Sequence, residues 1–131
     1  LVYVVIQSLD PPKARCLDEK PYTGPRLVFM NSFREVVDKY RVENSLLIAT
    51  SRYGKIPSIE ELRRVSSFED VIVLFGSPKH GLYDIAEEEG FNLVDYVDRV
   101  WNTIPNQRVK TIRTEEALIS TLAILNMFIN R

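Results

Sequence analysis

The stretch Asn102-Thr-Ile-Pro-Asn-Gln-Arg-Val-Lys-Thr-Ile-Arg-Thr-Glu-Glu-Ala-Leu-Ile-Ser-Thr-Leu-Ala-Ile-Leu-Asn126 joins a polar loop to an apolar helix. Asn102–Thr111 has no apolar periodicity, so we expect an irregular loop there. We expect the helix over Thr114–Asn130, with Thr114 as its N-cap. Glu115 and Glu116 fall in its first turn, where the helix dipole favours acidic side chains.

Two apolar stripes run along this expected helix. They are Leu118, Leu122, Leu125 and Ile129, and beside them Ala117, Thr121, Ile124 and Phe128. Together they cover most of the helix circumference, which is typical of a helix buried on all sides. Since one small domain offers few surfaces to bury it, we expect one side of the helix to meet a second subunit.

Upstream of this stretch, expected strands alternate with expected helices. The strands are Tyr3–Gln7, Arg26–Met30, Ser45–Thr50, Val71–Phe75 and Tyr96–Trp101. The helices are Ser32–Arg41, one opened by a capping box of Ser58 with Glu61, and Leu82–Glu89 ended by Gly90. Leu9–Pro25 is expected to be a loop, because it holds four prolines and a glycine. The alternation predicts an α/β fold whose mostly parallel sheet carries helices on both faces.

Three loops follow the third, fourth and fifth expected strands: Thr50–Gly54, Gly76–Gly81 and Asn102–Thr111. Ligands of parallel sheets bind beyond the carboxyl ends of the strands. The loops would therefore form one site if their strands are neighbours. Five cations lie in or beside them and are candidates for phosphate contact or for an ordinary solvated surface: Arg52, Lys79, Arg108, Lys110 and Arg113.

The sequence lacks the motifs of several common kinds of site. Gly76–Gly81 is neither a P-loop nor a dinucleotide fingerprint, so it is an ordinary strand-to-helix turn or a place where a ligand approaches bare backbone. One cysteine, Cys16, and one histidine, His80, without partners predict no metal site. A nucleophile elbow is also absent.

Size and composition set the class. The 131 residues suffice for one domain, and 45% hydrophobic with 27% charged residues is typical of a globular protein. We expect no membrane span, since every apolar run is short. We expect no signal peptide either, since Leu1–Ile6 lacks a basic leader. A single cysteine favours the cytoplasm. The net charge of −1 argues against tight RNA binding by this chain alone, although it allows a local basic patch.

The loop-and-helix stretch resembles the C-terminal motif of the SPOUT superfamily of RNA methyltransferases. The resemblance rests on Asn102–Gln107 and Thr111–Ala117, with Ala49–Gly54 and Leu74–Gly81 similar to two earlier loops. It covers about residues 45–131. The nearest branch is archaeal and eukaryotic and carries an inserted OB-like domain.

This resemblance implies a C-terminal trefoil knot, one of the rare exceptions to unknotted topology. It also implies S-adenosylmethionine as cofactor, a homodimer formed through the last helix, and RNA as substrate, most often ribosomal or transfer RNA. The cofactor-binding residues it implies are Thr50, Gly76, Ile104, Pro105, Asn106, Gln107, Val109, Thr114 and Ala117. We expect Arg52 and Arg113 to contact phosphate or a deprotonated acceptor, and Glu116 to orient the sulfonium donor.

The chain departs from the family in two places. Arg108 follows Gln107, where the family usually has glycine. The family's N-terminal part and its OB-like insertion are short or missing, so residues 1–131 are expected to be a complete or partial methyltransferase domain, with 9–25 a loop or the site of a missing insertion. Two alternatives stay open: a non-catalytic member that binds RNA or protein, and an unrelated, unknotted α/β nucleotide-binding or regulatory domain.

Overall fold

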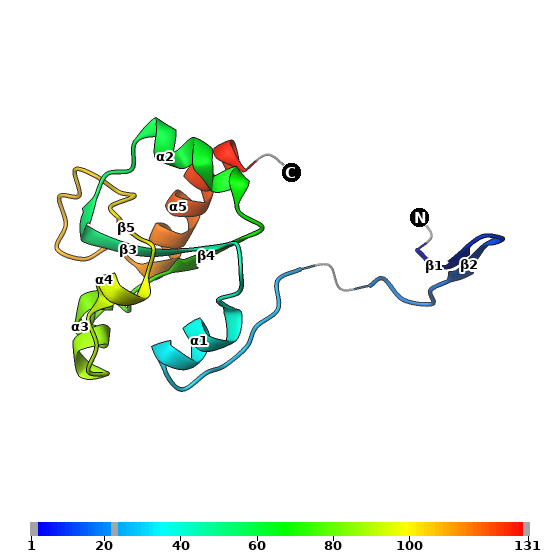
Figure 1. Ribbon diagram of the computed structural model, residues 1–131, viewed down its shortest axis with the longest axis horizontal. Helices are drawn as coiled ribbons and strands as arrows, with labels where there is room; N and C mark the ends of the chain where they lie inside the picture. The colour runs from blue at the N-terminus through cyan, green and yellow to red at the C-terminus, as the bar shows by residue number, and fades with distance from the viewer. Residues whose placement is uncertain (1–2, 22–23, 130–131) are drawn as a thin grey trace.

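A parallel three-stranded sheet organises the computed structural model, which describes residues 3–21 and 24–129. Its strand order is β4-β3-β5, with β3 (Ser45–Lys55) between β4 (Asp70–Leu74) and β5 (Arg99–Trp101). Ser45 to Ala49 of β3 pair in register with Asp70 to Leu74 of β4. The sheet expected from the alternating pattern is confirmed for these three strands, which lie side by side in Figure 1.

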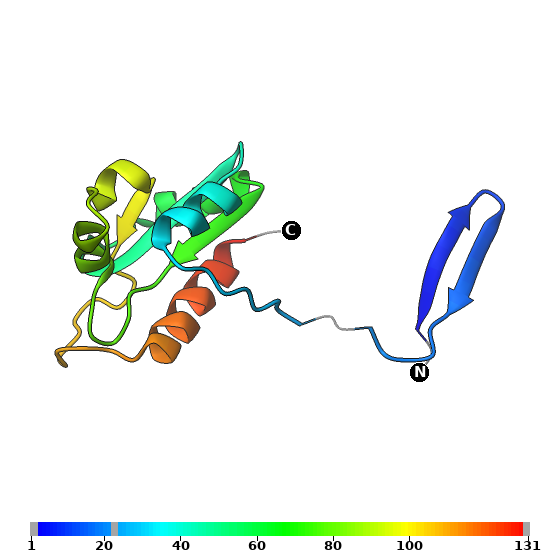
Figure 2. The same cartoon turned by 90° about the horizontal axis from the view of Figure 1, so that it is seen from below.

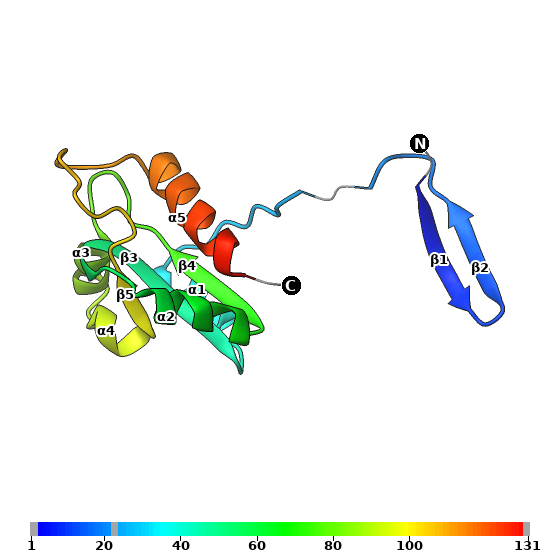
Figure 3. The ribbon, with the colours of Figure 1, turned by 90° about the horizontal axis from the view of Figure 1, so that it is seen from above.

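Helices cover both faces of this sheet because alternate residues of β3 point to opposite sides. Leu47 and Ala49 belong to a core formed with α1 (Phe33–Tyr40), α3 (Leu82–Glu88) and α4 (Leu93–Tyr96). Leu46 and Ile48 belong to a second core, formed with α2 (Ile59–Arg64) and α5 (Thr114–Phe128). Figures 1 and 3 show the resulting three layers. The expected α/β class with helices on both faces is confirmed.

Local signals fix several helix ends. The Ser58 hydroxyl accepts a hydrogen bond of 3.2 Å from the Glu61 amide, and Glu61 accepts one of 3.0 Å from the Ser58 amide. The predicted capping box is therefore confirmed. A short 3-10 helix, η1 (Val65–Ser67), follows α2 directly. Gly90, after α3, has a φ of 80°, the left-handed conformation expected of a glycine beyond a helix end.

An N-terminal hairpin stands apart from the α/β body in Figures 1 and 2. It pairs β1 (Val4–Leu9) with β2 (Pro12–Cys16) in antiparallel fashion. The expectation of a loop over Leu9–Pro25 was thus wrong for β2, which tolerates Pro12 because a strand's first residue needs no ladder donor. The strand expected over Arg26–Met30 was wrong as well. That segment has no regular structure, and Phe29 is 89% exposed.

The sequence pattern misplaced three further boundaries. The strand expected from Tyr96 begins only at Arg99, because Leu93 and Val97, four residues apart, turn through α4 to reach the core. Ser51–Gly54 belongs to β3 and is not a loop outside it. The last helix takes Arg113 as its N-cap in place of Thr114. The helix ends at Phe128 as described, and Asn130 lies outside the described residues.

The last helix is buried on one side only. Thr121 and Leu125 face the core. Its outer surface exposes an apolar set: Leu118, Ile119, Leu122 and Met127. This chain therefore covers one side of the helix, and the contact of another side with a second subunit stays a prediction.

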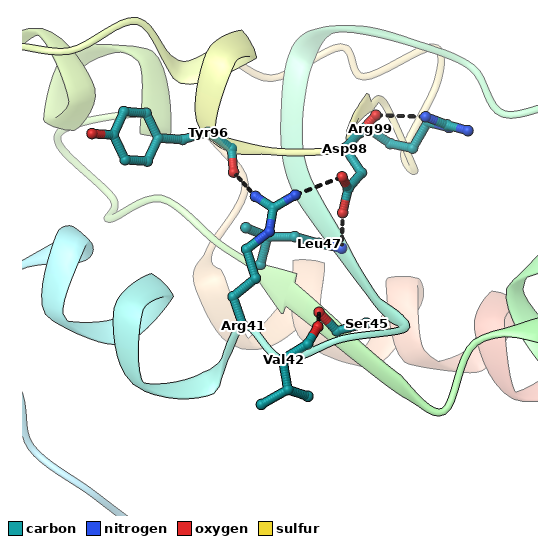
Figure 4. A network of polar contacts seen from close by, with 7 residues as sticks. All are labelled: Arg41, Val42, Ser45, Leu47, Tyr96, Asp98 and Arg99. Carbon is teal, nitrogen blue, oxygen red and sulfur yellow. Dashed lines mark hydrogen bonds and ion pairs between the residues drawn. The ribbon is translucent and has the colours of Figure 1, made fainter.

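A polar network at the amino ends of the strands fastens α1 to the sheet (Figure 4). The Asp98 carboxylate accepts a hydrogen bond of 2.8 Å from the amide of Leu47 and pairs with the Arg41 guanidinium at 2.8 Å. Arg41 also donates to the carbonyl of Tyr96. The network closes the edge of the sheet opposite to the loops described below. Within the residues described, no helix is long and apolar enough to cross a membrane.

Candidate functional site

Three loops meet at the carboxyl edge of the sheet. β3 lies between β4 and β5, so the segments that leave these parallel strands emerge together (Figure 3). They enclose a cavity of about 320 Å³, within the range of about 300–1,000 Å³ that holds small molecules. The wall includes Thr50–Tyr53 from β3, Phe75–Lys79 after β4, and Asn102–Ile104 after β5. The condition set by the sequence, that these strands be neighbours, is confirmed.

The first wall is a break in the ladder of β3. Thr50 and Lys55 both lie opposite Trp101 of β5, so the residues between them bulge out of the register. The Thr50 hydroxyl donates 2.7 Å to the carbonyl of Leu74 and ties this strand end to β4. Gly54 ends the bulge against β5, where a Cβ would stand 2.7 Å from the carbonyl oxygen of Val100. Only glycine fits this close approach.

Arg52 links two of the walls. Its Nη1 donates 2.9 Å to the carbonyl of Lys110, and its Nη2 donates 2.7 Å to the Tyr53 hydroxyl. Its own carbonyl accepts a hydrogen bond of 3.3 Å from Nδ2 of Asn102. Arg52, predicted to be catalytic, therefore lines the cavity, and its guanidinium already holds the first loop to the third.

The second wall is the turn after β4. The amide of Ser77 donates 2.8 Å to the carbonyl of His80, and the Ser77 hydroxyl accepts 2.9 Å from the His80 amide. A Cβ on Gly76 would lie 2.9 Å from that same carbonyl, so the glycine is needed for the tight turn as well as lining the cavity. The His80 ring lies outside the cavity lining, 3.8 Å from Glu88.

The third wall is the loop after β5. The side-chain Nε2 of Gln107 donates hydrogen bonds of 2.8 Å to the carbonyl of Val109 and 3.3 Å to the carbonyl of Lys110. These bonds fold the loop back on itself. Ile104 and Gln107, both predicted to bind cofactor, line the cavity. Three other predicted cofactor residues, Pro105, Asn106 and Val109, are exposed and lie outside its lining.

Arg108 occupies the position where the resembled family has glycine, and it is not strained. The described non-glycine residues with a left-handed backbone are Asn44 and Asn106, the latter with a φ of 64°. Asn106 therefore makes the sharp turn, with the residue type that tolerates it best after glycine. Arg108 is exposed and does not block the cavity.

The start of α5 closes the site. Thr114 and Ala117, both predicted to bind cofactor, line the cavity, and the Thr114 hydroxyl donates 3.3 Å to the carbonyl of Gly76. Arg113 and Glu116, predicted to be catalytic, are exposed and lie outside the lining. The Glu116 carboxylate accepts a hydrogen bond of 3.2 Å from the Arg113 amide, so it serves the helix N-terminus.

Two residues of the lining carry charge or polarity that the sequence did not single out. Tyr83 and Asp84 come from the first turn of α3. The Asp84 carboxylate accepts a hydrogen bond of 3.0 Å from the amide of Gly81. The signal was present, because Asp84 is the third residue of a helix that begins directly after a candidate loop.

The lining mixes charges of both signs with apolar groups. Lys79 and Lys110 contribute ammonium groups and Asp84 a carboxylate. Apolar wall comes from Phe75, Ile104, Ile112 and Ala117. Among residues 3–21 and 24–129, no three His, Cys, Asp or Glu side chains gather where they could hold a metal ion. The arrangement suits an organic ligand with an apolar ring and a zwitterionic end.

Comparison with known proteins assigns the chain to a group. A family model described as "Putative RNA methyltransferase" matches residues 4–125. An uncharacterised protein of Haloarcula marismortui is 32% identical over 145 residues, and one of Halobacterium salinarum is 30% identical over 140. Each match covers 96% of this chain and 48% of the relative, so the chain spans about half the length of these curated relatives.

Proposed function

Because the chain belongs to the SPOUT-type RNA methyltransferase family matched over residues 4–125, we propose that it transfers a methyl group from S-adenosylmethionine to a nucleotide of RNA. One observation carries this proposal. The bulge of β3 and the loops after β4 and β5, together with the start of α5, enclose a single cavity of small-molecule size.

The residues of the cavity fit the methyl donor. Adenine needs an apolar slot with backbone groups at its edge, and Phe75, Ile104 and Ala117 offer apolar surface beside loop backbone. The amino-acid end of the donor carries one ammonium and one carboxylate, which match the carboxylate of Asp84 and the ammonium of Lys79. We assign the backbone around Thr50, Gly76 and Ile104 to hold adenine and ribose.

The protein's part in the reaction is then positioning. When bound, the donor would supply an activated methyl group on a positively charged sulfur. The cavity walls around Thr50, Gly76 and Ile104 would hold the donor in place and limit the access of water to it. Arg52 lies on the same wall, where its guanidinium can meet an RNA phosphate or stabilise the acceptor atom after it loses its proton.

The remaining predicted residues would act outside the cavity. Arg113 and Arg108 are exposed cations near its edge and are candidates for phosphate contact with RNA. Glu116 is proposed to act on the donor only through the helix start that it caps. Pro105, Asn106 and Val109 shape the loop that carries Gln107. Ribosomal or transfer RNA is the substrate class we propose.

Three finer features of the family are proposed with the function. A two-stranded hairpin is marginal by itself, and β1 exposes Val4, Ile6 and Leu9, so we propose that the hairpin forms the edge of an OB-like domain.

The loop after β5 accepts a hydrogen bond from Arg52, and the start of α5 donates one to Gly76. We propose that the C-terminal segment is threaded at this place as the trefoil knot of the family. The exposed apolar surface of α5 supports a homodimer. A crystal structure that showed an unthreaded C-terminal segment would contradict the proposal of a knot.

A catalytic member of the family is favoured over a non-catalytic one. The residue that suggested lost activity, Arg108, is unstrained and exposed, and it leaves the cavity open.

Isothermal titration of the protein with S-adenosylhomocysteine tests the proposal. We expect binding by the wild type and a loss of at least about tenfold in Ala117→Leu, whose added volume enters the cavity. Ser66→Leu is the control, since Ser66 is exposed on η1 and lies outside the cavity lining and outside α5, so the substitution should leave affinity unchanged. A folded wild type that releases no heat would contradict donor binding.

A further inference from the structure

Tyr53 is an aromatic side chain in the cavity wall that folding leaves uncovered. It lines the cavity, yet 72% of its surface is exposed. Aromatic rings stabilise a fold when they are buried, and this ring is mostly exposed, so it contributes little in that way. A ring held open at the mouth of a ligand cavity is instead available to a molecule that arrives from solvent.

The bulge of β3 holds Tyr53 in place. Thr50 and Lys55 share Trp101 as their partner on β5, so the residues between them project beyond the ladder. Hydrogen bonds brace the projection: the Tyr53 amide donates 3.2 Å to the Ser51 hydroxyl, and Asn102 donates 3.3 Å to the Arg52 carbonyl. The close contact of Gly54 with β5 fixes its far end. The backbone that carries the ring is thus supported before any ligand binds.

Arg52 covers one face of the ring. Its guanidinium carbon lies 4.8 Å from the ring centroid, and its Nη2 donates 2.7 Å to the Tyr53 hydroxyl. Its Nη1 is held at 2.9 Å by the Lys110 carbonyl. The guanidinium therefore fixes the orientation of the ring. The exposed surface of the ring then belongs mainly to its opposite face.

We propose that the open face of Tyr53 stacks on an unpaired RNA base at the mouth of the cavity. A nucleobase is the flat ligand that such a ring recognises, and proteins that bind single-stranded RNA use exposed aromatic rings in this way. Lys110, which also lines the cavity, can meet a flanking phosphate. The base is unpaired, because within a duplex its faces are covered by its neighbours. This inference rests on the proposed function and names the form of RNA that the site accepts.

Binding of short single-stranded RNA that contains 2-aminopurine tests the stacking, because stacking on an aromatic ring quenches this base. We expect quenching by the wild type and a loss of about tenfold in affinity for Tyr53→Leu. Tyr53→Phe keeps the ring and should stay within about twofold of the wild type. Tyr40→Leu is the matched control: Tyr40 is also exposed and also carries a cation, Lys39, over its ring, yet it lies on α1 outside this cavity.

The outcomes separate this inference from the proposed function. If Tyr53→Leu binds single strands as the wild type does, or if the wild type binds none, the stacking is wrong. If Tyr53→Phe loses as much as Tyr53→Leu, the hydroxyl bond to Arg52 is what matters and the stacking is again wrong. Titration with S-adenosylhomocysteine is run on the wild type and on Tyr40→Leu, whose cavity lining is intact, and both should bind. Absence of donor binding in both proteins would instead contradict the methyltransferase itself.

Discussion

Arg52 shows how one residue type can hold a site together and still face its ligand. Its guanidinium bridges the Lys110 carbonyl and the Tyr53 hydroxyl, both of which are neutral acceptors. A phosphate or a deprotonated acceptor atom would add the attraction of an opposite charge to the hydrogen bonds of this cation. RNA could therefore compete with the Lys110 carbonyl for Arg52. This would weaken the link between the bulge of β3 and the loop after β5.

Glu61 leads to a prediction for acid stability at the residue scale. Its hydrogen bond with Lys55 and the bonds of the Ser58 cap hold the pKa of Glu61 at about 2, below its ordinary value of 4.5. Because the folded pKa is the lower one, the contribution is complete above about pH 4.5 and is lost as the pH falls toward 2. Glu61→Gln should reduce the free energy of unfolding by about 1 kcal/mol at pH 7 and by much less near pH 2.

Urea denaturation of both proteins at the two pH values measures this difference. Glu60→Gln is the control, since Glu60 lies on the same helix but is exposed and pairs only with Arg63 at 3.5 Å. If Glu61→Gln lowers the free energy of unfolding equally at both pH values, the helix cap does not depend on the charge of Glu61.

At the same scale, a site residue could be predicted from the sequence only where its place at a strand or helix boundary is enough to bring it to the cavity. Thr50 stands where the regular pairing of β3 ends, Gly76 follows β4, and Ala117 lies near the start of α5, so all three line the cavity. Arg113 and Glu116 belong to the same motif but are exposed and lie outside the lining, which a linear motif does not reveal. Tyr53 was unforeseen, because its exposure depends on how β3 pairs with β5.

Two hydroxyl groups join the third loop to α5 and give a prediction at the scale of elements. Thr103 and Thr121 share a hydrogen bond of 2.7 Å, and Thr121 is completely buried. Thr121→Val keeps the shape but leaves the Thr103 hydroxyl without its partner. We expect the free energy of unfolding to fall by about 1–3 kcal/mol.

The double variant Thr103→Val with Thr121→Val is the informative partner, because it removes both hydroxyls and leaves none unpaired. It should recover much of the loss in guanidinium denaturation, so that the two substitutions are strongly non-additive. Simple additivity would mean that the bond does not fasten the loop to the helix.

Elements were predictable where one periodicity ran without interruption. Ser45–Thr50 and Val71–Phe75 are continuous apolar runs and became the centre of the sheet. Arg26–Met30 looks equally apolar but has no regular structure, since a strand needs a partner that local sequence does not supply. The hairpin β1–β2 was concealed by Pro11 and Pro12, which lie at its turn.

At the scale of the whole molecule, the outer face of α5 predicts a second copy. Ile119 is 70% exposed and Leu122 is 47% exposed on a helix whose other face is core. A carboxylate at Leu122 would be desolvated in a dimer interface, so Leu122→Glu should give a monomer in light scattering. If dimerisation completes the site, the same variant should also bind S-adenosylhomocysteine more weakly.

Ile59→Glu provides the comparison for that experiment. Ile59 is a similarly exposed apolar residue on α2, and its replacement should leave the mass of the particle unchanged. A Leu122→Glu protein with the same mass as the wild type would contradict the homodimer and would assign the apolar face of α5 to a different partner.

Transfer of a methyl group to RNA is the central claim, and nucleoside mass spectrometry tests it directly. RNA from cells that lack the gene is incubated with S-adenosylmethionine and the wild-type protein, or its Ala117→Leu or Ser66→Leu variant. The account predicts that one methylated nucleoside rises with the wild type and Ser66→Leu and stays at background with Ala117→Leu. Donor binding without any new methylated nucleoside, or equal methylation by Ala117→Leu, would contradict it.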